Sequence, residues 1–310
     1  MIGVGGSLEP SLQVIVEIRL YRVFVTVGVG AALALSGGLM QGVFRNDLAS
    51  PSMLGVSSGA SLGAAIAVLA LGGYGPLSVL ANVSAYASFV VCASAFVGAI
   101  TVTALVATFA ASEGRISVPT LLLVGIALNA ICGGTLFAVQ AMVLDDFEVT
   151  RALINWSFGT LNDRVGFHAV LIFIAVVISA LILPFVRTEL DLFAGGEEDA
   201  QTLGVDTNRV KLLALGASAL AASVAVAVAG NIAFIGLVVP HVLRLLGGRS
   251  HKVLLPLCLL GGPVFLLGTD LLQRLALPGS IYGPGVTMSL VGGPFFLYLL
   301  MRNRKAVRTW

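Results

Sequence analysis

Residues 19–63 read RLYRVFVTVGVGAALALSGGLMQGVFRNDLASPSMLGVSSGASLG and decide the fold class. Two arginines three positions apart, Arg19 and Arg22, precede an apolar segment rich in glycine and alanine. The length of that segment matches the thickness of a bilayer. A polar turn at residues 45–51 follows, and small residues then open a second apolar segment. This layout predicts two membrane helices that pack closely through small residues.

The composition of the whole chain supports a membrane protein. Of the 310 residues, 58% are hydrophobic and only 10% are charged, whereas soluble domains carry about 25% charged residues. We therefore expect one all-α, polytopic membrane domain over residues 1–310. The net charge of +2 is too small to suggest a nucleic-acid partner. The three cysteines lie in apolar segments without metal-type spacing, so we expect no metal or cofactor bound by this chain.

Apolar segments long enough to cross a bilayer recur along the chain, and we predict about nine of them. Their approximate limits are 20–43, 53–72, 78–111, 118–144, 166–187, 210–230, 232–247, 253–275 and 285–301.

The lysines and arginines predict the orientation of these segments. When the connections are sorted alternately, twelve of the 17 basic residues fall on one side of the membrane and five on the other. The side richer in lysine and arginine is expected to be cytoplasmic. The C-terminus then lies inside the cell, and an odd number of spans places the N-terminus outside.

The longest polar interruption on the predicted inner side lies within residues 190–208. Glu197, Glu198 and Asp199 suit the first turn of a short helix, because acidic side chains are stabilised at the positive end of the helix dipole. Gly204 is a natural stop, and Ala200 and Leu203 would share one face. Such a helix could be a simple loop cap or a knob that fits a groove in a partner.

Residues 55–59 formally match the G-x-S-x-G motif of serine hydrolases, with Ser57 or Ser58 as the nucleophile. That motif requires a strand before it and a helix after it, whereas here a loop enters a membrane helix. Close helix packing is therefore the favoured interpretation, and an intramembrane protease is the alternative. His168 and His241 lie on opposite predicted sides, so neither is an obvious base.

The remaining polar residues give few further candidates. We expect His241 to be hydrogen-bonded at the interface and His251 to be solvated in a basic loop. A secondary transporter would need an intramembrane charge for ion coupling, and only Asp270 is available. The chain has no Walker loop, so it does not hydrolyse ATP alone.

Several motifs, in order, resemble the FecCD family. These are the ten-span permeases of importer-type ABC transporters that take up iron siderophores, heme and cobalamin. The motifs are RLYR at 19–22, GAALALSG with the following RNDLA within 30–49, MLGVSSGA at 53–60, GNIAFIGLVVPH at 230–241 and GGPFF at 292–296. Tyr21 and Asp47 replace prolines of the family pattern, and Pro284 stands one position late. The resemblance also implies a further helix before residue 19. We expect either that the sequence starts late or that this chain lacks the first helix of the family.

The resemblance implies a homodimer in the plasma membrane of a bacterium or archaeon. Each copy would contact one ATP-binding subunit, which carries ATP and Mg, and an extracytoplasmic substrate-binding protein would dock outside. The translocation path would follow the dimer interface. Heme, cobalamin and siderophores are not distinguished by the sequence.

The same resemblance assigns roles to individual residues. It implies coupling to the ATPase by Gly196, Glu197, Glu198, Ala200, Leu203 and Gly204. It implies docking of the binding protein by Arg19, Arg22 and Arg274, for which ordinary interfacial arginines are the alternative. It implies a path along Asn129, Gly133, Gly134 and Gln140, for which interhelical hydrogen bonds are the alternative to a path role for the two polar side chains.

Overall fold

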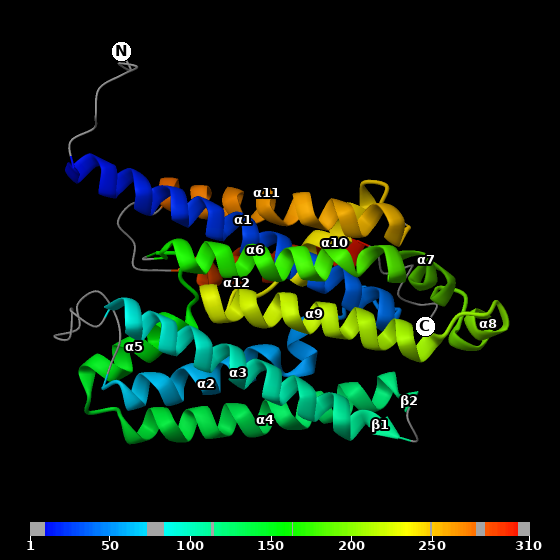
Figure 1. Ribbon diagram of the computed structural model, residues 1–310, viewed down its shortest axis with the longest axis horizontal. Helices are drawn as coiled ribbons and strands as arrows, with labels where there is room; N and C mark the ends of the chain where they lie inside the picture. The colour runs from blue at the N-terminus through cyan, green and yellow to red at the C-terminus, as the bar shows by residue number, and fades with distance from the viewer. Residues whose placement is uncertain are drawn as a thin grey trace, which may run out of the picture.

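The computed structural model describes residues 10–72, 84–112, 115–162, 164–248, 250–276 and 283–302. These residues form an elongated helical bundle, which confirms the predicted all-α membrane fold (Figure 1). The helices are α1 (Pro10–Phe44), η1 (Pro51–Leu54), α2 (Val56–Ala70), α3 (Ser84–Ala110), α4 (Val118–Met142), α5 (Phe147–Ser157), α6 (Gly166–Leu181), α7 (Leu183–Phe193), α8 (Glu197–Thr202), α9 (Thr207–Ala229), α10 (Ile235–Leu245), α11 (His251–Ala276) and α12 (Pro284–Arg302). Two-residue strands, β1 (Ala111–Ser112) and β2 (Arg115–Ile116), pair antiparallel between α3 and α4.

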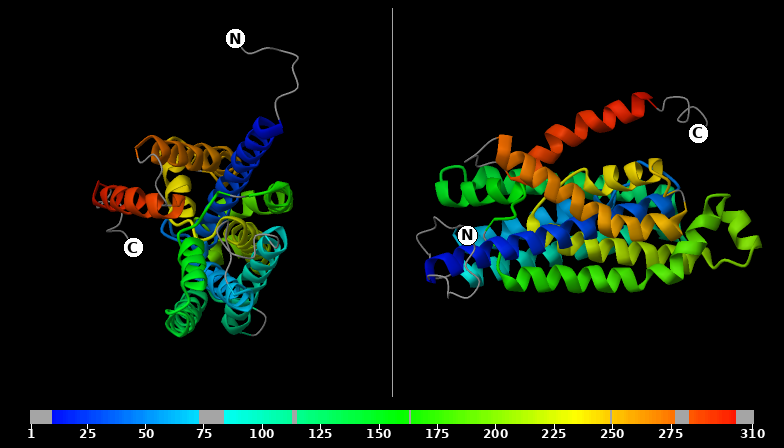
Figure 2. Two further views of the ribbon diagram at one scale, coloured as in Figure 1. Left: turned by 90° about the vertical axis from the view of Figure 1, so that its left-hand side faces the viewer. Right: turned by 90° about the horizontal axis from the view of Figure 1, so that it is seen from above.

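The two ends of the bundle differ. α8 projects beyond the long helices at one end, close to the β1–β2 pair, and α5 lies at the opposite end (Figure 1). We call these the α8 end and the α5 end. Seen from above, α12 leans away from the rest of the bundle (Figure 2, right).

α1 is the central helix of the bundle, and it packs against α6, α9, α10 and α11. Glycines allow its backbone to approach two neighbours directly. A Cβ atom at Gly30 would lie 2.6 Å from the Gly262 carbonyl oxygen, and one at Gly37 would lie 1.7 Å from that of Gly236. Since lipid supplies no hydrophobic drive for helix association, van der Waals packing at these close contacts helps to hold α1 against α10 and α11.

α2, α3 and α4 form a second packed group. A Cβ at Gly59 would lie 2.5 Å from the Gly98 carbonyl oxygen, and one at Gly125 would lie 1.9 Å from that of Met53. On α4, the buried residues are few: Leu121, Gly125 and Cys132. Most of α4 is therefore at least partly exposed in the single chain.

Among the described residues, five helices are long and apolar enough to cross a membrane. They include residues 16–44, 86–110, 118–142, 207–229 and 251–276. The α6–α7 pair makes a sixth span if it counts as one, and α2 and α10 are apolar but have only 15 and 11 residues. Residues 78–83 of the third predicted segment lie outside the described part.

Three predicted boundaries need correction. The first helix begins at Pro10, so Arg19 and Arg22 lie within it and do not precede it. The segment predicted at 166–187 is broken by a bend of 56° between α6 and α7, because Pro184 cannot donate the helical hydrogen bond and crowds the preceding turn. The segment predicted at 232–247 is helical only from Ile235, after Phe234 in a left-handed conformation with φ of 68°.

α5 is an additional helix between the segments predicted at 118–144 and 166–187. Its N-terminus is capped by Asp146, whose side chain accepts a hydrogen bond from the Val149 amide at 3.1 Å. Acidic caps of this kind satisfy free amides in the first turn. The capping residue was the local signal that could have revealed this helix.

Candidate functional site

A groove of about 350 Å³ runs between α2 and α4. Its polar lining comes from Ser52, Ser57, Ser58, Ser61, Asn129 and Asn231, and no charged residue lines it. The serines at 57 and 61 are four positions apart, so they lie on the same face of α2. The spacing of these serines is the sequence signal that could have predicted a polar face on α2.

Asn129 connects the two sides of this groove. The Ser58 hydroxyl donates to Asn129 Oδ1 at 2.6 Å, and Asn129 Nδ2 donates to the Ser52 carbonyl at 3.0 Å. The interhelical hydrogen bond that was the alternative for Asn129 is therefore present, and the residue also lines the groove.

The four predicted path residues divide into two pairs. Gly133 lines the groove together with Asn129. Gly134 and Gln140 are absent from its lining, although both lie on α4. The structure therefore brings together two of the four residues.

Ser57 and Ser58 are not arranged as nucleophiles. The single Ser58 hydroxyl proton is shared between Asn129 Oδ1 and the Gly55 carbonyl oxygen, which lies 3.1 Å away. His168 lies in α6, where its Nε2 is 3.1 Å from the Ser88 hydroxyl and its Nδ1 accepts from the Val165 amide at 3.3 Å. No histidine among the described residues is hydrogen-bonded to either serine, so a serine–base pair is not formed there.

α8 matches the predicted short helix in residues 190–208. Gly196, with φ of 135°, precedes it, and Gly204, with φ of 85°, follows it, so both positions favour glycine. The three acidic residues occupy its first turn as expected. Ala200 and Leu203 do not share a face, however. Ala200 is fully buried and Leu203 is 67% exposed, because Leu203 lies just beyond the last helical residue.

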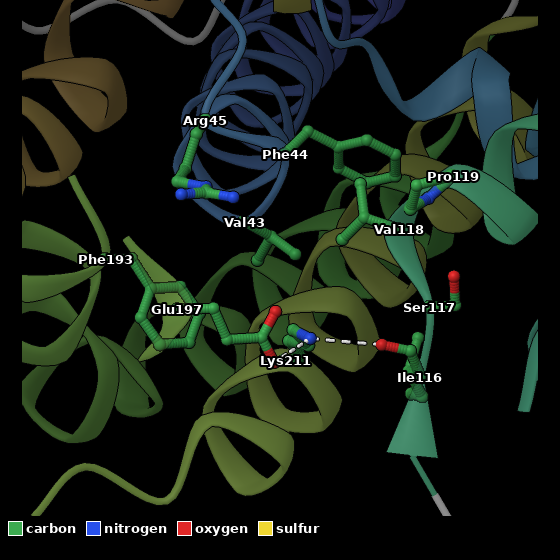
Figure 3. A pocket seen from close by; sticks show the side chains of 10 residues that line it. All are labelled: Val43, Phe44, Arg45, Ile116, Ser117, Val118, Pro119, Phe193, Glu197 and Lys211. Atoms are coloured by element: carbon green, nitrogen blue, oxygen red, sulfur yellow. Dashed lines mark hydrogen bonds and ion pairs between the residues drawn. The ribbon is translucent and has the colours of Figure 1, made fainter. Parts of the chain in front are cut away.

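A pocket of about 340 Å³ lies beside α8, between the end of α1 and the start of α4. Glu197 points into it and meets the ammonium group of Lys211 from α9 at 2.5 Å (Figure 3). Lys211 was not singled out from the sequence. A lone lysine near the start of an apolar helix was the available signal.

At the α5 end, the three predicted docking arginines differ in their surroundings. Arg22 on α1 forms an ion pair with Asp270 on α11 and a hydrogen bond with Asn162. Arg274 reaches the same carboxylate at 3.3 Å, with a side chain that is 49% exposed. Arg19 is exposed. Asp270 is therefore neutralised by two arginines, which removes the observation behind the secondary-transporter alternative.

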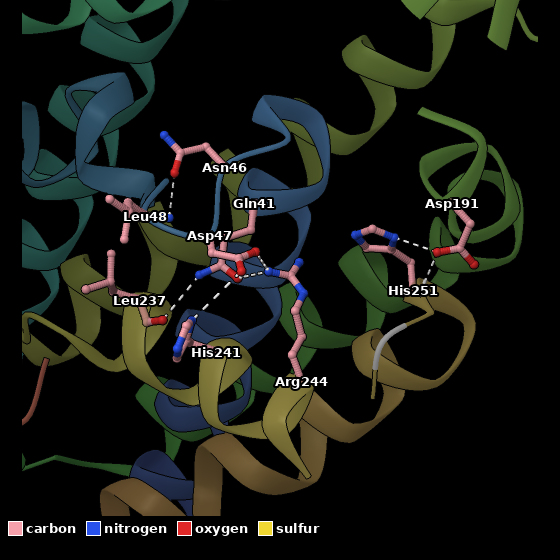
Figure 4. Close-up of polar contacts among 9 residues, drawn as sticks. All are labelled: Gln41, Asn46, Asp47, Leu48, Asp191, Leu237, His241, Arg244 and His251. Carbon is pink, nitrogen blue, oxygen red and sulfur yellow. Dashed lines mark hydrogen bonds and ion pairs between the residues drawn. The ribbon is translucent and has the colours of Figure 1, made fainter. Parts of the chain in front are cut away.

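A polar cluster joins Asp47, which follows α1, to Arg244 in the last turn of α10 (Figure 4). Arg244 contacts Asp47 in an ion pair and donates to Gln41 Oε1 at 2.7 Å. Asp47 thus has a partner at the position where the family pattern has proline. The prediction that His241 is hydrogen-bonded was wrong, because both of its ring nitrogens are buried without a hydrogen bond and Asp47 Oδ2 is 4.0 Å from Nδ1.

His251 also differs from its prediction. It is 8% exposed and not solvated. Its Nδ1 lies 2.7 Å from Asp191 Oδ1, and its backbone amide donates to the same oxygen at 2.7 Å (Figure 4). Since Asp191 belongs to α7, this pair joins the end of the bent α6–α7 pair to the start of α11.

The geometry is that of a membrane bundle with an uncharged polar groove and a short projecting helix. The profile of the FecCD transport family matches residues 4–302. The chain belongs to the FecCD transport family. FecCD motifs account for the glycine-rich packing of α1 and for the serines at the start of α2, which carried the resemblance in the sequence.

Named relatives agree with this FecCD assignment. The chain is 38% identical over 290 residues to the hemin transport system permease protein HmuU of Yersinia pestis, covering 93% of this chain and 83% of the relative. It is 39% identical over 302 residues to the cobalamin import system permease protein BtuC of Halobacterium salinarum, covering 97% and 76%. This FecCD chain is a transport protein and not an enzyme.

A solved structure extends the FecCD comparison to the fold. It is described as an inward-facing conformation of an ABC transporter of metal-chelate type. The two chains superpose with a TM-score of 0.82 at 27% sequence identity, over 97% of this chain and 91% of the other. The FecCD chain is therefore an ABC-importer permease with the same helical arrangement.

Proposed function

We propose that this chain is the membrane subunit of a plasma-membrane importer for a metal chelate of the iron-siderophore, heme or cobalamin type. The observation that carries the proposal is the groove between α2 and α4, lined by serine and asparagine and lying against an exposed transmembrane helix. An uncharged polar surface can pass a large chelate without binding it tightly, because it offers hydrogen bonds but no ion pair. Hemin and cobalamin permeases among the relatives support this substrate class.

A second copy of the chain completes the path in this proposal. Large apolar side chains on α4 are exposed, among them Leu123 at 69%, Phe137 at 72% and Met142 at 84%. A symmetric dimer that pairs the α4 regions would bring two grooves together around one axis. Alternating access would then follow from a shift between two arrangements of these helices.

A separate ATPase subunit, which holds ATP and Mg, drives the change. α8 is the segment proposed to enter the ATPase, with Glu198 and Leu203 on its accessible surface. Its position at the end of the bundle supports this role (Figure 1). The α8 end is then cytoplasmic, in agreement with the lysine and arginine bias, and the C-terminus lies on that side.

The α5 end is proposed to receive the substrate-binding protein. Arg19 and Arg274 are the exposed cations available there, whereas Arg22 is mostly engaged within the chain. Exposed rim charges mainly set the orientation and rate of association.

Reconstitution tests the proposed function. The chain is placed in proteoliposomes with its ATPase subunit and its binding protein, and uptake of hemin, cobalamin and a ferric siderophore is measured with and without ATP. We expect ATP-dependent uptake of one of these chelates. Equal uptake without the ATPase subunit would refute the importer mechanism, and ATP-dependent uptake of an unrelated solute alone would refute the substrate class.

A further inference from the structure

Lys211 is a buried lysine that joins three separate elements at the α8 end. It lies on α9, and its side chain is 6% exposed. Its Nζ donates to Glu197 Oε1 on α8 at 2.5 Å and to the Ile116 carbonyl on β2 at 3.1 Å (Figure 3). One ammonium group therefore connects the short projecting helix to the segment that leads into α4.

Two side chains of α9 bind the backbone of Ile116. Its amide donates to Asn208 Oδ1 at 3.4 Å, and its carbonyl accepts from Lys211. Ser117 follows as the residue before α4, and α4 begins at Val118. Two side chains of α9 thus hold the backbone of Ile116, which lies two residues before the start of α4.

The charge of Lys211 makes this connection sensitive to the position of α8. A buried ammonium group is costly without an anionic partner. Of the residues lining the adjacent pocket, Glu197 is the only acid, and Arg45 adds a second cation at its edge. Any displacement of α8 that moves Glu197 away leaves Lys211 uncompensated beside another positive charge, so the position of α8 and that of Lys211 are energetically linked.

We propose that Lys211 is a positioning residue that transmits movement of α8 to α4. When the ATPase displaces α8, Glu197 moves Lys211, and Lys211 moves the Ile116 peptide at the start of the helix that lines the groove. This inference rests on the proposed function, because it assigns the connection between the proposed coupling helix and the proposed path.

The test removes the connection without leaving a buried charge. In the double variant Lys211→Met/Glu197→Gln, both charges disappear together, a change that is often neutral for stability. ATP hydrolysis and chelate uptake are then measured in the same reconstituted complex. We expect hydrolysis close to that of the wild type, with uptake per ATP lowered by about 2- to 30-fold, the range for substitutions along a coupling connection.

Matched variants separate positioning from general stability. Lys252→Met makes the same replacement at an exposed lysine of the α8 end and should leave uptake per ATP unchanged. Lys211→Arg keeps the charge and both donor functions, so it should retain most of the coupling. Asn208→Ala removes one of the two contacts to Ile116 and should also lower uptake per ATP, but by less than the double variant.

Two results would overturn the inference. One is a double variant that is stably assembled and transports with the wild-type ratio of uptake to hydrolysis. The other is a double variant in which ATP hydrolysis and uptake fall by the same factor, so that uptake per ATP is unchanged. If the double variant does not assemble, a wild-type ratio in Asn208→Ala overturns it instead. Failure of the wild-type complex to import any chelate with ATP would count against the proposed function, which is a distinguishable outcome.

Discussion

Arg22 on α1 and Asp270 on α11 form an ion pair between positions 248 residues apart in the sequence. Their side chains are 16% and 12% exposed, so the pair is largely enclosed. α1 and α11 also approach through Gly30 and Gly262, and the ion pair fixes the same two helices nearer the α5 end. Arg22 is therefore primarily part of the bundle and not a free cation of its surface.

Removal of the carboxylate at position 270 should destabilise the chain. In Asp270→Asn, Arg22 stays enclosed without its counter-charge, and loss of one partner of a buried pair typically costs about 3–5 kcal/mol. We expect a clear fall in the thermal unfolding midpoint of the purified protein in detergent. Arg274→Gln, which removes the half-exposed partner of the same carboxylate, is the control and should change stability by about 0–1 kcal/mol. Equal effects of the two variants would contradict the assignment.

Charge reversal at the exposed arginines should weaken docking of the binding protein. Arg19→Glu combined with Arg274→Glu reverses two accessible cations at the α5 end and leaves Arg22, the enclosed partner of Asp270, unchanged. We expect a slower association rate, with the largest difference from wild type at low ionic strength, because salt screens exposed charges. Association kinetics with the binding protein in nanodiscs provide the measurement. An unchanged rate at low salt would exclude a docking role for both arginines.

Gly37 should not tolerate even a methyl group. Gly37→Ala places a Cβ 1.7 Å from the Gly236 carbonyl oxygen, so α1 and α10 must separate. Overpacking usually costs about 1–3 kcal/mol, and here the obstacle is backbone that cannot rotate away. We expect a lower unfolding midpoint or loss of folded protein.

Gly216→Ala is the matched control for that substitution. A Cβ at Gly216 on α9 meets nothing within 4 Å. Alanine is favoured over glycine within helices by about 0.5–1 kcal/mol, so this variant should be as stable as the wild type or slightly more stable. If Gly216→Ala were destabilised, the effect of Gly37→Ala could not be assigned to close packing between α1 and α10.

Asn129 should be needed for transport more than Gln140. Asn129→Leu removes the hydrogen bonds to Ser58 and Ser52 and replaces a polar group of the groove with an apolar one. We expect uptake to fall by about tenfold, which corresponds to roughly 1.4 kcal/mol, while the binding protein still docks. Gln140→Leu changes a residue outside the groove lining and should retain uptake. The reverse order of effects would place the path elsewhere along α4.

Local features of the sequence predicted several elements correctly. α8 follows from residues that are adjacent in the chain, with acidic residues in its first turn and glycine at each end. Close packing of α1 follows from glycine and alanine inside an apolar segment. The break between α6 and α7 also has a local cause, because Pro184 lies at the bend. The sequence did not predict it, because the apolar run continues across Pro184.

The candidate site was only partly predictable. The resemblance placed Asn129 and Gly133 on a path helix, and both line the groove. It could not separate them from Gly134 and Gln140, because which face of α4 meets α2 depends on how the helices pack. Likewise, the sequence predicted that Leu203 and Ala200 share one helix face. In the structure they do not, because the helix ends at Thr202, one residue before Leu203.

The sequence by itself determined that the chain lies in a membrane and that its fold is helical. An apolar chain with few charges enters the bilayer, where helices form the hydrogen bonds of the backbone N–H and C=O groups. The sequence also determined the family, through motifs that are contiguous in the chain. The tertiary structure alone decided which charge meets which. Arg22 with Asp270, Asp47 with Arg244 and Lys211 with both Glu197 and Ile116 all depend on which helix ends lie together. Burial requires that each charge has a partner, but the choice of partner is made by helix packing over long sequence separations.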